Sequence, residues 1–217
     1  MLTVGRDGAA VNRDLLAGLV RCPECGGVLG PWGWAARRSV WAGLDGREGP
    51  GVAWRPRRAR CRSCRRTQVL LPAGLLSRRC DSAAVIASAL EASASGWGYR
   101  RAAAAVGRPE STVRGWLSAA RRVAGRAQAG FAGVLALVAP DAAAAAPGAE
   151  SGVAGFVGAC AGLAAGLAQR WRQVRAGWLE VAAAACRCQV LCAGWWAQHG
   201  PALPLAAWPA AVWPGGP

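Results

Sequence analysis

The chain has 217 residues, which is enough for one ordinary domain or for two or three small ones. Its 26 basic residues are all Arg and are unevenly placed: residues 1–128 hold 22 Arg and 8 acids, a net +14, and residues 129–217 hold 4 Arg and 3 acids, a net +1. This distribution favours a polyanionic partner, most often nucleic acid. The alternatives are a solvated Arg-rich surface and an anionic membrane.

The first twenty residues exclude a secretory signal, because Arg6, Asp7, Arg13 and Asp14 interrupt them and no long apolar core follows. We therefore expect a cytoplasmic protein. Thiols stay reduced in that compartment, so paired cysteines indicate metal binding rather than disulfides.

Two C-x-x-C pairs, in "CPECGG" and "CRSC", are the first candidate site. Zn²⁺ prefers four ligands in a tetrahedron, and a C-x-x-C turn lets two sulfurs reach one ion. We expect a single structural Zn²⁺ bound by Cys22, Cys25, Cys61 and Cys64. A catalytic zinc is not expected, because four cysteines leave no position for water. A redox pair and an iron–sulfur cluster are the competing interpretations.

The insert between the pairs should carry structure, because its 35 residues exceed the usual ribbon spacing of about 15–20. The runs "RRSVWAGLDG" and "GVAWRPRRARC" indicate two strands around a turn that contains Gly and Asp. Four tryptophans are expected to form a small apolar patch beside the metal: Trp32, Trp34, Trp41 and Trp54. Four arginines would offset the negative charge of the thiolates: Arg60, Arg62, Arg65 and Arg66.

Helical patterning begins after the second pair. The expected elements are a helix capped by Asp81 or Ser82 and broken at residues 96–98, a short helix from Tyr99 to Val106, a turn at Gly107, and a helix from Pro109 to about Arg122. This order predicts a helix-turn-helix with Val106, Val113 and Trp116 on its inner face.

The outward face of the third helix predicts contacts to duplex DNA. The expected base contacts are Glu110, Ser111, Arg114, Gly115 and Ser118, with Arg114 suited to guanine. The expected phosphate contacts are Arg100, Arg101, Arg121 and Arg122. The alternative for the motif is a three-helix bundle that binds protein.

The tail is dominated by Ala, Gly and Trp. The stretch "SGVAGFVGACAGLAAGLA" has 18 residues without a charge and borders on the length of a membrane span. We expect a helical hairpin that packs on the first domain or on a partner chain, with a membrane anchor and disorder as alternatives. Three cysteines and the lone histidine of the tail suggest a second metal site: Cys186, Cys188, Cys192 and His199. We expect plain packing for these residues instead, and also for Cys80 and Cys160.

The stretches "RCPECGGVLGPWGWAARRSV", "RPRRARCRSCRRTQVLLPAGLL" and "GYRRAAAAVGRPESTVRGWL" resemble an uncharacterised bacterial family. That family joins a transposase-type zinc ribbon to a homeodomain-like helix-turn-helix, and the resemblance covers about residues 15–126. Similar modules precede the nuclease domain of several insertion-sequence transposases. Only Asp141, Glu150 and Glu180 are acidic in the last 89 residues, so the resemblance implies the DNA-binding part without the catalytic part.

We therefore predict an α+β chain. Its expected parts are an N-terminal extension (1–14), a small β zinc ribbon (15–79), a homeodomain-like helix-turn-helix (80–126), a linker (127–150), a helical hairpin (151–199) and an irregular Pro-rich tail (200–217). The expected function is zinc-stabilised, sequence-specific binding of double-stranded DNA, as a homodimeric transcriptional regulator or a non-catalytic helper of a mobile element. Neither enzymatic activity nor a small-molecule substrate is expected. The alternative is a protein-interaction module or an inactive transposase derivative that binds DNA non-specifically.

Overall fold

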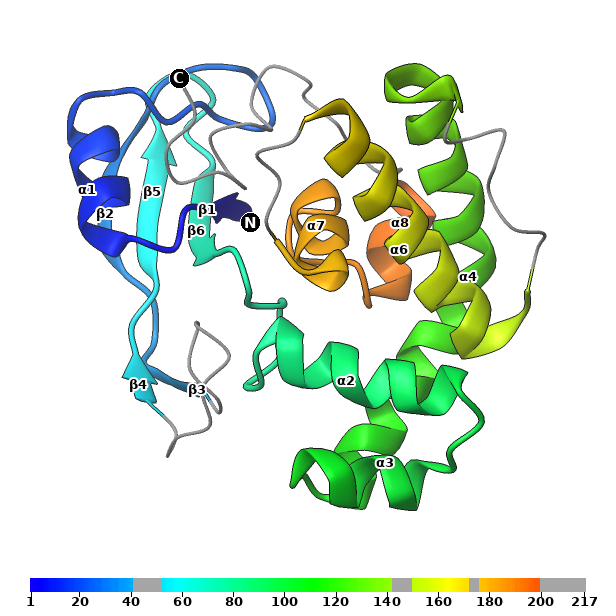
Figure 1. Ribbon diagram of the computed structural model, residues 1–217. Helices are drawn as coiled ribbons and strands as arrows, with labels where there is room; N and C mark the ends of the chain where they lie inside the picture. Colours follow the sequence, from blue (N-terminus) through cyan, green and yellow to red (C-terminus); the bar gives the residue numbers. More distant parts are fainter. Residues whose placement is uncertain (41–51, 142–149, 172–175, 200–217) are drawn as a thin grey trace.

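The computed structural model describes residues 1–40, 52–141, 150–171 and 176–199. It confirms an α+β chain in which an N-terminal sheet lies beside a larger helical body (Figure 1). Within the described residues, the strands are β1 (Leu2–Val4), β2 (Leu29–Trp34), β3 (Arg38–Val40), β4 (Val52–Trp54), β5 (Arg57–Cys61) and β6 (Thr67–Pro72). The main sheet has the order β1-β6-β5-β2, and β3 and β4 form a separate antiparallel pair.

The β3–β4 pair confirms the two strands expected in the insert between the cysteine pairs. The turn that joins them, with Trp41, lies outside the described residues. The expected apolar tryptophan patch is wrong for Trp32 and Trp34. Each of these side chains is 50% exposed, and each has an arginine over its ring. Trp32 lies with Arg60 on the outer face of the sheet, whereas the irregularity in β2 places Trp34 with Arg57 on the opposite face.

The N-terminal extension expected over residues 1–14 is instead part of the sheet domain. β1 pairs in parallel with β6, and α1 (Gly8–Leu16) follows it, capped by the Asp7 carboxylate on the backbone N–H of Ala9. Leu15 is fully buried against the strands, in a small core with Leu29 and Leu70. Because β1 has three residues and its partner is distant in the sequence, local patterning could not indicate the pairing.

The helical body has its own core. Its helices in the described residues are α2 (Ala83–Ala94), α3 (Tyr99–Val106), α4 (Glu110–Val138), α6 (Gly152–Arg170), α7 (Trp178–Ala185) and α8 (Ala193–Gln198). Trp116, Phe131 and Phe156 are its largest fully buried side chains. α4 runs along one side of this body, and α6 packs along it (Figure 1).

The third helix of the helix-turn-helix is longer than its expected end near Arg122. α4 continues to Val138, so the expected linker is helical over residues 127–138. Phe131, Val134, Leu135 and Val138 recur at helical spacing and are buried. Their packing on α6 outweighs the low helix propensity of the glycines in this segment. Residues 142–149 of the expected linker lie outside the described part of the chain.

The tail forms α6, α7 and α8 where it is described, rather than the two helices of a hairpin. α6 is long and apolar enough to cross a membrane by length and composition. However, Val153, Phe156, Leu163 and Leu167 bury one face of α6 in the helical core, so that face is covered by the protein itself. The irregular segment expected over residues 200–217 lies outside the described residues.

Candidate metal centre and nucleic-acid interface

The four predicted cysteines converge at one end of the main sheet. Their sulfur atoms all lie within 4.8 Å of one another. The Sγ atoms of Cys22 and Cys64 are 3.7 Å apart, and those of Cys25 and Cys61 are 3.5 Å apart. Four sulfurs about 2.3 Å from a central Zn²⁺ would be roughly 3.8 Å apart, whereas a disulfide joins two sulfurs at about 2.05 Å. The donor set and spacing therefore fit a tetrahedral metal ion.

Backbone geometry holds each pair of cysteines in a tight turn. In the first turn the N–H of Gly26 donates to the carbonyl of Cys22 at 2.9 Å, and Gly26 has a φ of +71°. In the second turn the N–H of Cys61 donates to the carbonyl of Arg66 at 2.9 Å, and Arg65 takes the left-handed conformation with a φ of +62°. The strands β2 and β5, which follow and precede these turns, are hydrogen-bonded to each other and fix the distance between them.

The thiols of the second turn have opposite pKa shifts. Although burial opposes ionisation of Cys61, backbone N–H groups of Cys64 and Ser63 donate to its sulfur and lower its pKa to about 6. The pKa of Cys64 is raised to about 12: a backbone N–H from Arg66 favours its thiolate, but burial and the three neighbouring sulfurs disfavour a second negative charge. A divalent cation would remove this repulsion, because metal binding deprotonates cysteine ligands.

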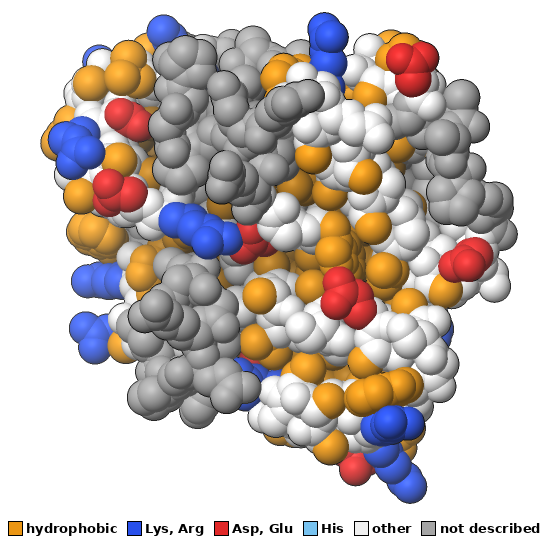
Figure 2. Space-filling model, viewed as in Figure 1, with side chains coloured by type: hydrophobic (Ala, Val, Ile, Leu, Met, Phe, Trp, Pro, Cys, Tyr) orange, Lys and Arg blue, Asp and Glu red, His pale blue; other side chains and the backbone are white. Residues whose placement is uncertain are grey.

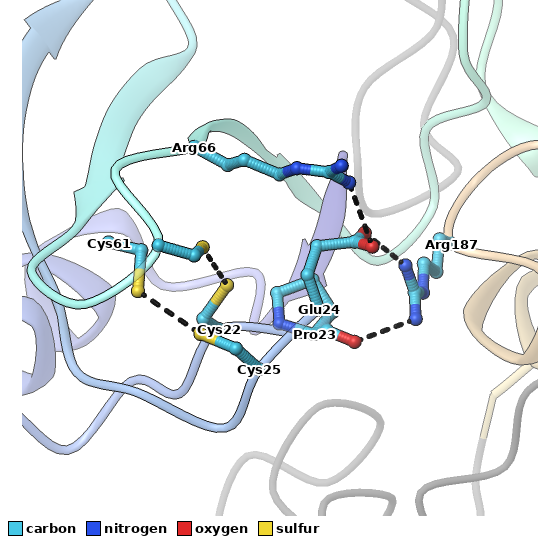
Figure 3. Close-up of polar contacts among 8 residues, drawn as sticks. Cys22, Pro23, Glu24, Cys25, Cys61, Arg66 and Arg187 are labelled. Atoms are coloured by element: carbon cyan, nitrogen blue, oxygen red, sulfur yellow. Dashed lines mark hydrogen bonds and ion pairs between the residues drawn. The ribbon is translucent and has the colours of Figure 1, made fainter.

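An acidic residue inside the first turn connects the cluster to the tail (Figure 3). Glu24 accepts from Arg66 of the second turn at 3.3 Å and from Arg187 of the tail at 2.8 Å. Arg187 also donates to the carbonyl of Pro23 at 3.0 Å. Arg66, which was expected to offset the thiolate charge, instead pairs with Glu24. The contact of Arg187 could not be expected from the sequence, since no local pattern relates residues so far apart in the chain.

The tail makes further contacts with the sheet domain. The sulfur of Cys188 and the hydroxyl of Thr3 are hydrogen-bonded at 3.0 Å. The backbone carbonyl of Cys188 accepts from the N–H of Ser77 at 2.7 Å. Arg6 pairs with Glu180 of α7. These contacts confirm that the tail packs on the first domain.

The other cysteines do not join a metal cluster in the described part of the chain. Cys160, Cys186 and Cys188 are buried, and burial raises the pKa of each thiol. Cys192 is half-buried, Cys80 is exposed, and His199 stacks on Trp195. Cys160 and Cys186 pack as small apolar side chains, whereas Cys188 is buried with its hydrogen bond to Thr3.

The helix-turn-helix has the expected order of elements. The Ser82 hydroxyl caps α2 by accepting from the N–H of Val85, α3 spans Tyr99–Val106, and Gly107 makes the turn with a φ of +61°. Val113 and Trp116 are fully buried between the helices. Asp81, the other candidate cap, is buried and instead forms an ion pair with the partly buried Arg108. That pair fixes the start of α2 to the turn before α4 and was not expected from the sequence.

The predicted base-contact residues share the outer side of the first turns of α4. Glu110, Ser111, Arg114 and Gly115 are exposed, and Ser118 is half-buried. The Ser118 hydroxyl accepts a 2.7 Å hydrogen bond from Arg122, which ties that side chain to the helix surface. The Arg114 guanidinium lies 5.9 Å from the Tyr99 ring centre, so the surface of the predicted base contacts is continuous with the start of α3.

The predicted phosphate-contact residues are also exposed, on α3 and α4. Arg101 lies over the Trp97 ring at 3.8 Å, and Arg100 pairs with Glu110 at 3.5 Å. A hydrogen bond to the Tyr99 oxygen, together with the charges of Tyr99 and Glu110, raises the pKa of Arg100. Basic side chains gather over α3, at the end of the molecule away from β1 and α1 (Figure 2).

Comparison with known proteins bears on this second region. A family model described as a homeodomain-like domain matches residues 82–131, which include α2, α3 and most of α4. Residues 82–131 form a homeodomain-like helix-turn-helix. Such domains place their third helix in the major groove, so the match indicates DNA as the partner. The match does not extend to the cysteine cluster. Comparisons with curated proteins and with solved structures found no match.

Proposed function

We propose that the chain is a zinc-stabilised, sequence-specific binder of double-stranded DNA, and that it regulates transcription or assists a mobile element without catalysis. The carrying observation is the exposed first part of α4 within the homeodomain-like domain. Arg114 projects from that part of the helix with a planar fork that can donate two hydrogen bonds to guanine. The buried Trp116 and Val113 hold the opposite side of the helix rigidly, as base recognition requires.

In this proposal the arginines around the helix-turn-helix position the protein on the duplex. Arg101, Arg121 and Arg122 are exposed on the same helices as the reading face and would contact phosphates. Arg100 would leave its ion pair with Glu110 and form an ion pair with a phosphate instead. These contacts carry no sequence information but make the affinity fall with increasing salt.

The metal in this proposal is a structural Zn²⁺ held by four cysteines. The sheet domain has a small core of its own, in which the fully buried leucines are Leu15, Leu29 and Leu70. Small domains of this kind gain stability when a metal joins their loops. The ion would hold both cysteine turns together, and through Glu24 and Arg187 it would also support the docking of the tail.

One helix-turn-helix reads few base pairs, so we propose a homodimer on paired half-sites. The test is selection from a random duplex library with zinc-loaded full-length protein at near-physiological salt. An enriched motif with two-fold symmetry is the expected result. Recovery of DNA without any enriched motif would contradict sequence-specific recognition. An enriched single half-site would contradict only the dimer and would leave sequence-specific recognition standing.

A further inference from the structure

We propose that the outer face of β2 and β5 binds single-stranded nucleic acid, at a surface separate from the helix-turn-helix. This surface, the Trp–Arg face, consists of Trp32, Arg60 and Arg62. It includes one of the tryptophans that were expected in an apolar patch. Basic side chains line this edge of the molecule beside hydrophobic ones, on the left in Figure 2.

The indole ring of Trp32 is exposed and is paired with a guanidinium. Half of the Trp32 surface is in solvent, although tryptophan is usually well buried. The Arg60 guanidinium lies 4.5 Å from the Trp32 ring centre. A second stack, of Arg57 on Trp34, lies on the opposite face of the sheet. An exposed aromatic–guanidinium stack beside further arginines is typical of a recognition surface.

The arginine of the first stack is held in place before any ligand binds. Arg60 donates from Nε to the carbonyl of Arg65 at 3.0 Å. The sheet fixes the pairing further, since the β2–β5 register places Arg60 opposite Gly30, two residues before Trp32. Preorganised side chains lose little conformational entropy on binding, which raises affinity.

A pocket of about 230 Å³ adjoins the first stack. It is lined by Gly30, Pro31, Trp32, Arg60, Arg62 and Arg65, together with the backbone around Cys61. Glycine and proline in its wall leave the flat side of the indole accessible. Residues 52–80 contribute nine Arg and no Asp or Glu, so the charge around this face is uniformly positive.

These features fit nucleic acid with unpaired bases. Bases stack on aromatic rings and on guanidinium planes, and arginines that line the same groove pair with the phosphates. In a duplex each base is already stacked between its neighbours, so its flat side is not available to an indole. The Trp–Arg face therefore selects single strands, whereas the helix-turn-helix reads the edges of paired bases.

The test compares two probes on the full-length protein by fluorescence anisotropy: a labelled oligothymidylate and a labelled duplex. The variant Trp32→Ala is expected to lose at least about fivefold in affinity for oligothymidylate, because a base–aromatic stack contributes measurably to binding. Its duplex affinity is expected to stay within about twofold of the unmodified protein. The matched control is Leu137→Ala, which removes an exposed apolar side chain from α4 and should change neither affinity.

Two further variants distinguish this proposal from the proposed duplex function. Trp32→Phe keeps a smaller aromatic ring and should recover part of the single-strand affinity. Arg114→Ala should weaken duplex binding and leave oligothymidylate binding unchanged. The proposal is overturned if the unmodified protein does not bind oligothymidylate, if Trp32→Ala binds it normally, or if that variant loses both affinities equally.

Discussion

Gly27 lies directly against the second cysteine turn, so its replacement by Ala tests whether the cluster is a metal site. A methyl group added there would lie 2.5 Å from the Ser63 hydroxyl oxygen, 3.0 Å from Ser63 Cβ and 3.1 Å from Cys61 Sγ. The hydroxyl can rotate away, but Ser63 Cβ and the sulfur of a metal ligand cannot move without displacing the turn. Gly27→Ala should therefore separate the two cysteine pairs.

The expected cost is that of overpacking a fixed site, roughly 1–3 kcal/mol. Since about 1.4 kcal/mol corresponds to a tenfold change in an equilibrium constant, zinc affinity should fall by about fivefold to 150-fold. Competition for Zn²⁺ with a chromogenic chelator measures this directly on the purified protein. Thermal unfolding of the zinc-loaded protein should shift downward in parallel, because metal binding and folding are coupled.

Ser63→Gly supplies the rescue, because it removes both the Oγ and Cβ atoms that meet the new methyl group. The double variant Gly27→Ala/Ser63→Gly should recover most of the lost zinc affinity. Gly26→Ala is the matched control: its φ of +71° makes Ala strained, but nothing lies within 4 Å of the added group. Ser63→Gly should therefore not rescue Gly26→Ala. Unchanged zinc affinity in Gly27→Ala, or no rescue by Ser63→Gly, would refute the assigned geometry.

Further predictions concern the reading face, the metal and the tail. Arg114→Ala should weaken binding to a selected duplex by roughly 1–3 kcal/mol and relax base preference, whereas Arg122→Ala should lower affinity evenly across sequences; equal, sequence-independent losses for both would refute the assignment of the face. Cys22→Ser should abolish zinc binding and unfold the sheet domain, and a variant that keeps both its fold by circular dichroism and its metal content would contradict the site. Arg187→Ala should lower the melting temperature by about 3 °C. The variant loses a partly exposed ion pair and a hydrogen bond, which together contribute roughly 1 kcal/mol to stability. An unchanged melting temperature would show that this contact is not stabilising.

Local sequence signals predicted the elements that depend on neighbouring residues. The order of helix, Gly107 turn and helix could be read directly because a left-handed turn and an amphipathic helix have short-range signatures. The four cysteines could be grouped before their geometry was known, because the ligand preference of Zn²⁺ constrains residue type and spacing. The β3–β4 pair followed from the same kind of pattern.

Features that depend on tertiary packing could not be predicted. The continuation of α4 to Val138 relies on burial against α6, which the glycines in its sequence argue against. β1 joins the sheet through a parallel pairing with β6 that no local pattern specifies. Arg187 reaches Glu24 only because the tail folds back onto the sheet domain, and its left-handed conformation, with a φ of +49°, is held by those contacts.

The exposure of Trp32 and Trp34 also escaped prediction, since tryptophans near a small metal site are ordinarily core residues. Whether a strand side chain faces the core or the solvent depends on register, and β2 has an irregularity between Pro31 and Trp34 that changes it. A run of arginines on the facing strand was the one signal that could have indicated an outward, cation-paired face.

Sequence-specific recognition of duplex DNA by the homeodomain-like domain is tested most directly by the ratio of two dissociation constants. They are measured with zinc-loaded full-length protein at near-physiological salt, one on the duplex recovered by selection and one on a scrambled duplex of equal length and composition. Specific recognition predicts that the selected duplex binds at least about 10³-fold more tightly. A ratio near one, with both affinities falling steeply as salt increases, would show that the arginines bind phosphates without reading bases.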